Sequence, residues 1–245
     1  MTVDLNQANN LAKNPVNTGT SVLAIKFDGG VAMAADTLAS FGSMARYGKV
    51  SRIFDANRRT LLGVSGDYAD FQYLKRHLQA KIMDDQRLDD THEFNPSAIY
   101  NWLSCVLYDR RSEFNPLFNQ YVIGGLNKMN GETKPFLGTV NKLGVTYESS
   151  FIVSGLGNFM VQQILENEYK KVKSAKSGDT LLTKKEAVEL LRNCMTILFY
   201  RDARAHTNIS AEYDGFPIRM ILVVLRWEKF LLFSVNYYIN KYTSC

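Results

Sequence analysis

The chain alternates between short apolar runs and segments whose apolar residues recur every three or four positions. Three blocks of the first kind are separated by two pairs of the second kind. An apolar or alternating run of about four to eight residues predicts a β-strand, whereas a repeat of three or four predicts an amphipathic helix. The pattern therefore predicts strands, two helices, strands, two helices and strands, in that order.

The predicted strands are rich in β-branched and aromatic residues and are bounded by turn-forming residues. They cover 20–27, 31–36, 42–46, 50–54 and 60–65 in the first block, 121–123, 136–140, 145–147 and 151–154 in the second, and 207–213 and 218–225 in the third. The Gly29-Gly30 pair between the first two strands is typical of a tight hairpin turn.

Each predicted helix has a recognisable beginning. The first follows Gly66, the second begins at Pro96, the third follows Gly157, and the fourth opens at the capping box of Thr183 and Glu186. Helices that follow each block of strands in pairs can cover both outer faces of a sheet system. The sequence therefore predicts an α+β fold, a four-layer α-β-β-α sandwich.

The regular pattern divides the chain into three parts without a Pro/Gly/Ser-rich linker. We expect an N-terminal arm at residues 1–19, one sandwich domain at 20–226 and a C-terminal tail at 227–245. The arm is polar and shows no periodicity that could bury a face. The tail is very apolar for a chain end, so it either packs back on its own domain or reaches a neighbouring subunit.

Composition excludes several classes of protein. The 245 residues include 29 Lys and Arg against 24 Asp and Glu, a mild net charge of +5. No stretch approaches the roughly 18 apolar residues of a membrane span, and the polar N-terminus is unlike a secretory signal. No basic stripe interleaved with aromatic residues suggests a nucleic-acid surface. We expect neither a membrane nor a nucleic acid as partner.

Cysteine and histidine are scarce. Cys105, Cys194 and Cys245 lie far apart, and only three histidines are present. An odd number of scattered cysteines argues against a disulfide framework and a zinc site, and fits a reducing compartment. We therefore expect no metal and no cofactor.

The candidate for chemistry is the Gly19-Thr20 pair at the start of the first predicted strand. A threonine hydroxyl becomes a useful nucleophile when its own free α-amine can accept its proton. This would require cleavage between Gly19 and Thr20. Taken alone, the pair is more simply a dipeptide at the start of a strand.

Further motifs extend this candidate. They are the run from Thr20 to Asp36, Ser65-Gly66-Asp67, Ser154-Gly155 and Tyr200-Arg201-Asp202-Ala203. In order and spacing, over about residues 18 to 225, they resemble the β-type subunits of the 20S proteasome. The resemblance implies the N-terminal-nucleophile hydrolase fold and a location in the cytoplasm and nucleus. It also implies α- and β-type partner subunits in a 28-subunit barrel of stacked seven-membered rings.

The resemblance also assigns positions in a threonine protease site. Thr20 stands where active members carry the nucleophile, and Asp36 matches the acidic residue beneath it. Gly66 matches the glycine whose backbone N–H binds the oxyanion. Ser154 and Asp202 match the residues that flank the nucleophile's amine.

Several positions depart from the pattern of active members. Arg52 replaces a lysine that tunes the nucleophile's proton, and arginine does not release a proton near neutral pH. Ala205 replaces a serine and lacks its hydroxyl. Leu156 and Leu38 replace a further serine and an arginine, and Tyr68 lies where it could fill the specificity pocket.

These departures predict that the site is degenerate and that no residue is catalytic. Because 19 residues precede Thr20, its nitrogen is a peptide amide that cannot act as a base. We therefore expect a non-catalytic structural β subunit, similar to the seventh β type, with any trimming nearer Leu11 than Thr20. The alternatives are an active threonine endopeptidase captured as its precursor and, less simply, a stand-alone adaptor of the same fold.

Overall fold

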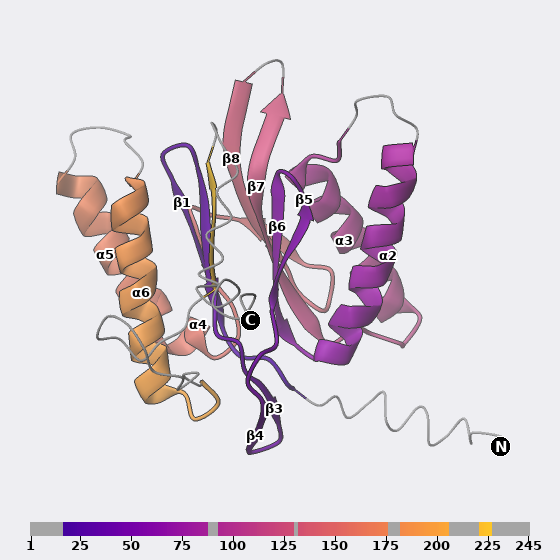
Figure 1. The fold of residues 1–245 in the computed structure, drawn as a ribbon, viewed down its shortest axis with the longest axis horizontal. Helices are drawn as coiled ribbons and strands as arrows, with labels where there is room; N and C mark the ends of the chain where they lie inside the picture. Colours follow the sequence, from indigo (N-terminus) through magenta and orange to yellow (C-terminus); the bar gives the residue numbers. More distant parts are fainter. Residues whose placement is uncertain (1–16, 88–92, 130–131, 176–181, 206–220, 227–245) are drawn as a thin grey trace, which may run out of the picture.

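Two β-sheets lie face to face, with a pair of helices outside each sheet (Figure 1). The computed structural model describes residues 17–87, 93–129, 132–175, 182–205 and 221–226. The predicted α+β class and the four-layer α-β-β-α order are confirmed. The arm up to residue 16, the tail at 227–245 and the strand predicted at 207–213 lie outside the described residues.

The first sheet has four antiparallel strands in the order β10-β1-β2-β11. The strands are β1 (Val22–Phe27), β2 (Gly30–Ala35), β10 (Phe151–Val153) and β11 (Ile221–Arg226). Every residue of β2 is buried, because one face of the sheet packs on helices and the other on the second sheet. This explains why the sequence of β2 is apolar throughout rather than alternating.

The second sheet has five antiparallel strands in chain order. They are β5 (Ile53–Asn57), β6 (Thr60–Gly66), β7 (Asn119–Met129), β8 (Glu132–Val140) and β9 (Thr146–Glu148). A layer of buried apolar side chains fills the space between the two sheets, with Met33, Leu61 and Val122 among its members. At Gly63 a β-carbon would lie 2.6 Å from the Met33 sulfur, so the sheets approach closely there.

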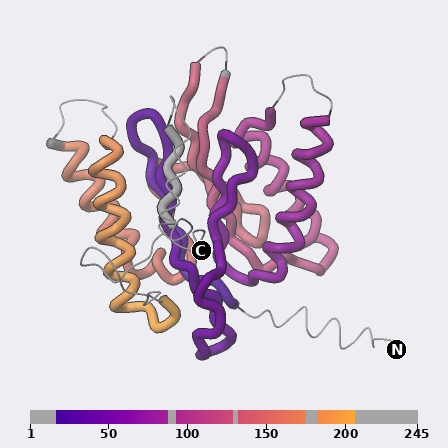
Figure 2. Tube along the Cα trace, in the orientation of Figure 1, coloured from indigo at the N-terminus to yellow at the C-terminus, as the bar shows by residue number. Residues whose placement is uncertain are grey.

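Two helix pairs form the outer layers. The second sheet is covered by α2 (Tyr68–Arg87) and α3 (Pro96–Ser112), and the first by α5 (Gln162–Ala175) and α6 (Lys184–Arg201), with the short α4 (Gly157–Met160) ahead of α5. The capping box predicted at Thr183 and Glu186 is present. Figure 2 shows how the chain passes from the first sheet to the second before either helix pair forms.

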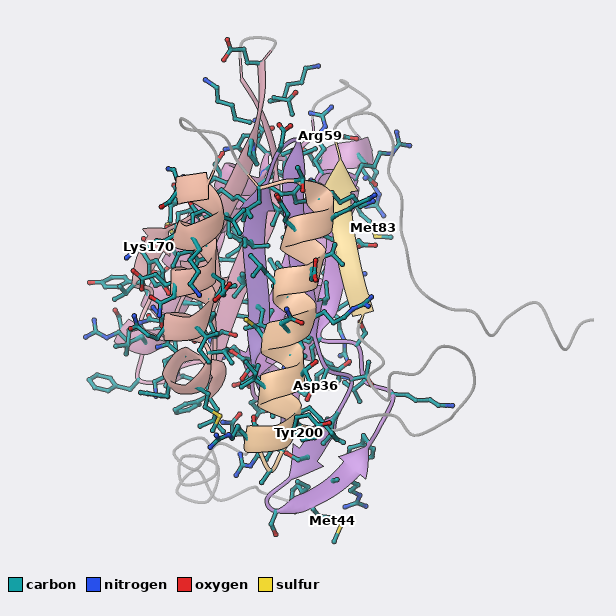
Figure 3. The ribbon with its side chains drawn as sticks, turned by 90° about the vertical axis from the view of Figure 1, so that its left-hand side faces the viewer. Asp36, Met44, Arg59, Met83, Lys170 and Tyr200 are labelled. Carbon is teal, nitrogen blue, oxygen red and sulfur yellow. The ribbon has the colours of Figure 1, made fainter. Side chains whose placement is uncertain are left out.

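The structure corrects two local predictions. The single strand predicted at 42–46 is a hairpin of β3 (Ala39–Phe41) and β4 (Met44–Tyr47), because Gly42, at φ +60°, reverses the chain. The helix predicted after Gly157 is interrupted at Val161, so it becomes α4 and α5. The hairpin projects beyond the sandwich at the end where the candidate site lies (Figures 1 and 3).

Candidate active site at the start of the first strand

The register of β1 and β2 brings Thr20 to Asp36. Val22 pairs with Ala35, so the residues before β1 lie beside the residue that follows β2. The Thr20 hydroxyl is 3.0 and 3.1 Å from the two carboxylate oxygens of Asp36 and donates its proton to them. Both side chains are buried. Figure 3 labels Asp36 towards the end of the sandwich at which α6 finishes, where Tyr200 is also labelled.

Arg52, which precedes β5, holds this pair from the second sheet. Its guanidinium forms an ion pair with the Asp36 carboxylate and donates from Nη2 to the Thr20 hydroxyl at 3.2 Å. Nη1 donates to the carbonyl oxygens of Thr20 and Ser21 at 2.8 and 3.2 Å, and Nε to that of Asp36 at 3.2 Å. Arg52 is 1% exposed, so it is a structural part of the core between the sheets.

Burial lowers the pKa of Arg52 to about 9, and the negative charge of Asp202 partly opposes this shift. Arg52 therefore stays protonated at neutral pH and cannot take up a proton from the Thr20 hydroxyl. That hydroxyl already donates to Asp36 and accepts from Arg52. The arrangement holds the hydroxyl between a hydrogen-bond acceptor and a charged donor.

The residues just before Thr20 are bonded to the sandwich. Gly19 forms a β-bridge with Gly66, and its N–H donates to the Gly66 carbonyl at 2.9 Å. The Thr18 hydroxyl accepts from the backbone N–H of Tyr68 at 2.8 Å. A β-carbon on Gly19 would lie 3.6 Å from the Gly66 nitrogen, so the chain ahead of Thr20 runs beside the group that the family resemblance assigns to the oxyanion.

Ser154 and Asp202 are buried, but neither is hydrogen-bonded to the nitrogen of Thr20 in the described part of the chain. The Ser154 hydroxyl accepts from the N–H of Val22 at 3.1 Å and lies 3.3 Å from its carbonyl, so it ties β10 to β1. One Asp202 oxygen accepts from the Arg204 N–H at 2.9 Å. The other is buried and has no hydrogen-bond partner among the residues that the structure describes.

Asp202 also acts on the buried cation of the site, because its negative charge opposes the lowering of the Arg52 pKa. Ala205, which follows Asp202, offers no hydroxyl, and its N–H donates to the Asp202 backbone carbonyl at 3.0 Å.

A cavity of about 180 Å³ opens beside Thr20. Its lining residues are Asn17, Gly19, Thr20, Ser65, Gly66, Gln120, Gly155, Leu156 and Arg204. Tyr68 is not among them, and its ring lies 5.6 Å from that of Phe71 between centroids. The expectation that Tyr68 fills a specificity pocket stays a prediction. Leu38, by contrast, is buried at 3% exposure, and Leu156 is 43% exposed at the rim.

Sequence reasoning missed Arg204 as a cavity residue. Its position two residues after Asp202 was a usable signal, because the turn that ends α6 carries both. Gln120 could not be found this way, since it reaches the cavity only through the pairing of β7 with β6, where it lies opposite Ser65.

The described residues show neither a membrane-spanning helix nor a metal-ligand cluster. None of their helices is long and apolar enough to cross a membrane. No group of three or more His, Cys, Asp or Glu residues is placed to hold a metal ion in the ranges that the structure covers.

The four-layer sandwich, with a threonine buried at the start of its first strand, is an N-terminal-nucleophile hydrolase fold. Residues 16–213 match the family model described as proteasome subunit. The chain belongs to the proteasome subunit family, so the family suggested by its motifs is confirmed.

The chain is similar to β-type subunits of several eukaryotes. It is 48% identical over 197 residues to proteasome subunit beta type-4 of Xenopus laevis, covering 80% of this chain and 77% of that protein. Identity to the beta type-4 subunit of Drosophila melanogaster is 43% over 193 residues, 79% and 67% of the two chains. Identity to proteasome subunit beta type-7 of Saccharomyces cerevisiae is 39% over 202 residues, 81% and 73% of the two chains.

Proposed function

We propose that this chain is a non-catalytic, structural β subunit of the 20S proteasome core. It completes a β ring of the particle, and other subunits carry out the proteolysis. The observation that carries the proposal is the fixed state of Thr20. Its hydroxyl is held between Asp36 and Arg52, and its nitrogen is bonded to Gly19, whose backbone is hydrogen-bonded to Gly66.

The same proposal extends to the assembly. The subunit would contact α- and β-type neighbours in a barrel of 28 subunits, arranged as stacked seven-membered rings, in the cytoplasm and the nucleus. The arm at 1–19 and the apolar tail at 227–245 would contribute to these contacts. The particle would degrade proteins marked by ubiquitin.

A second candidate is an active threonine endopeptidase captured as its precursor. The retention of Thr20 and Asp36 in hydrogen-bond contact favours it. Cleavage before Thr20 would free an α-amine that could act as the base for its hydroxyl. Cleavage would not change Arg52 or Ala205, however, so the two departures closest to the chemistry would remain.

The test is the state of the N-terminus in the assembled particle. We expect N-terminal sequencing and intact mass to show a chain that begins before Thr20 and forms no adduct with an electrophilic peptide probe. A chain that begins at Thr20 and carries the probe would overturn the structural function and support the precursor. A native chain that elutes at the mass of a single subunit, outside any particle, would support the adaptor instead.

A truncated variant separates processing from chemistry. We expect a chain that begins at Thr20, incorporated into the particle, to remain unlabelled because Arg52 still holds the hydroxyl and Ala205 still lacks one. Labelling of this variant would show that the arm alone silences the site, and would contradict the assignment of that role to Arg52 and Ala205.

A further inference from the structure

Phe114 has an unusual backbone conformation. It follows α3 with φ +57°, and it is the non-glycine residue with positive φ in the part of the chain that the structure describes. A bulky side chain in this left-handed region crowds its β-carbon against the backbone. The conformation therefore carries a cost that a glycine at this position would avoid.

The position is the residue after the cap of a helix that ends in a Schellman motif. The Phe114 N–H donates to the Arg111 carbonyl at 3.2 Å, and the Asn115 N–H donates to the Arg110 carbonyl at 3.0 Å. Glycine is strongly favoured at this place, with asparagine next, because the residue must be left-handed. Phe114 is thus disfavoured by the local structure that holds it.

Packing within the chain does not explain the phenylalanine either. Its side chain is 95% exposed, the largest value among the exposed large hydrophobic residues described. The flanking Arg111, Ser112, Glu113 and Asn115 are also exposed. A single exposed apolar residue is ordinary. At position 114, however, the backbone conformation favours glycine, and packing within the chain does not account for a phenylalanine.

The loop nevertheless holds Phe114 in a defined place. The two helix-capping hydrogen bonds fix it on one side, and Pro116 and the buried Leu117 fix the chain on the other. An aromatic side chain on a pre-organised backbone loses little entropy on binding, which is typical of the residues that dominate protein interfaces.

A small apolar patch formed by α3 and a turn packed against it supports this interpretation. Tyr108, Leu143 and Val145 are 53%, 45% and 57% exposed. They are neighbours because the turn that carries Leu143 and Val145 packs on α3: the Ser104 hydroxyl donates to the Gly144 carbonyl at 3.0 Å. The Arg111 guanidinium carbon lies 5.8 Å from the centroid of the Tyr108 ring and so extends this surface towards the end of α3.

We infer that Phe114 is an interface anchor, which inserts into an apolar pocket of a neighbouring proteasome subunit when the particle assembles. The inference rests on the proposed structural function, because it requires a partner subunit. Arg111, Glu113 and Asn115 form the polar rim around the anchor, the arrangement in which rim residues exclude water from a central aromatic group.

The test is a competition between the full-length wild-type chain and a Phe114→Gly variant, carrying different tags and co-expressed with the other subunits. We expect the variant to be depleted about tenfold or more in the assembled particle, which corresponds to about 1.4 kcal/mol. In denaturant or thermal unfolding of the purified chain, the same variant should be more stable, by about 2–4 °C, because the left-handed strain is relieved. Greater stability with poorer incorporation cannot result from misfolding.

Two further variants complete the design. Phe114→Leu keeps an apolar side chain and should compete better than Phe114→Gly. Met83→Ala removes another exposed apolar side chain, on α2 (Figure 3), and should be incorporated like the wild type.

Incorporation of Phe114→Gly at the wild-type level would overturn the anchor and leave the proposed function standing. Equal depletion of Met83→Ala would also overturn it, since any exposed apolar residue would then have the same effect. Absence of the wild-type chain from every particle would instead overturn the proposed function, and the anchor with it.

Discussion

The hydroxyl of Thr18 accepts a hydrogen bond from the backbone N–H of Tyr68, 2.8 Å away, at the first residue of α2. The same hydroxyl lies 3.2 Å from the Gly66 carbonyl, to which it donates. A residue that the sequence pattern places in the arm thus satisfies one of the unpaired amides at a helix start 50 positions away. Thr18 and Gly19 therefore contact the sandwich through hydrogen bonds, although they precede its first strand.

This contact predicts the effect of removing the Thr18 hydroxyl. We expect Thr18→Ala to lower the free energy of unfolding by about 1 kcal/mol, the usual cost of losing a side-chain cap. Denaturant unfolding of the full chain measures it. Thr18→Ser retains the hydroxyl and should stay close to the wild type; an equal loss in both variants would show that the methyl group, not the cap, is responsible.

The buried pair of Arg52 and Asp36 predicts a strong non-additive effect. Arg52→Met leaves the Asp36 carboxylate buried without its cation, so we expect a loss of about 3–5 kcal/mol in the free energy of unfolding. Adding Asp36→Asn removes the stranded charge, and the double variant should recover much of the loss. Denaturant unfolding of the four chains forms a double-mutant cycle. A double variant that is less stable than Arg52→Met would contradict the pairing.

Cys194 in α6 predicts a pH dependence of stability. Burial, and to a lesser extent the charge of Glu168, raises the pKa of the Cys194 thiol from 9.0 to about 11. Because the folded chain keeps this proton longer than the unfolded chain, the contribution is complete below pH 9 and is lost as pH rises towards 11. The loss amounts to about 2 kcal/mol.

The measurement is unfolding by denaturant between pH 8 and pH 11, the wild type against Cys194→Ala. Cys194→Ala should lower the free energy of unfolding equally at every pH, because the side chain is missing. Above pH 9, however, its free energy of unfolding should decline less steeply than that of the wild type. Parallel curves would contradict the assignment of that part of the decline to Cys194. Buried Tyr121, whose pKa is also raised, titrates in both chains and cancels in the comparison.

We expect a side chain at Gly66 to clash with its surroundings, and Gly29 provides a comparison without a clash. It has φ +113°, and a β-carbon there would lie 2.2 Å from the Phe118 carbonyl oxygen. Gly29 also has positive φ, +81°, but a β-carbon there meets nothing within 4 Å. We expect Gly29→Ala to cost about 1 kcal/mol from conformation alone, and Gly66→Ala to cost at least about 3 kcal/mol. Equal losses, measured by thermal unfolding, would show that the backbone near Gly66 relaxes.

The layer order was predictable because it follows from local patterns. The fully apolar β2, the apolar stripe of α2 and the capping box at Thr183 each signal one element within a few residues, and each is present. Errors occurred where a single residue reverses or interrupts the chain. Gly42 and Val161 did so, and their neighbours carried no periodicity strong enough to reveal it.

The candidate site was predictable as a set of residues, through the resemblance to a family, but its contacts were not. Gln120 illustrates the difference: it lines the cavity only because β7 pairs with β6, which places it opposite Ser65. Whether the site is silent in the assembled particle stays a prediction, for which the N-terminus of the mature chain is the test.

The sequence by itself therefore determined the elements, their order and the chemical groups available near Thr20, since these depend on residue type and short-range spacing. Only the tertiary structure decided that Asp36, Arg52 and Thr18 converge on this region, because hydrogen bonds across 16, 32 and 50 positions depend on strand register and on how the two sheets pack. It also decided that Phe114 is left-handed and exposed, since the end of α3 fixes that conformation whatever residue stands there.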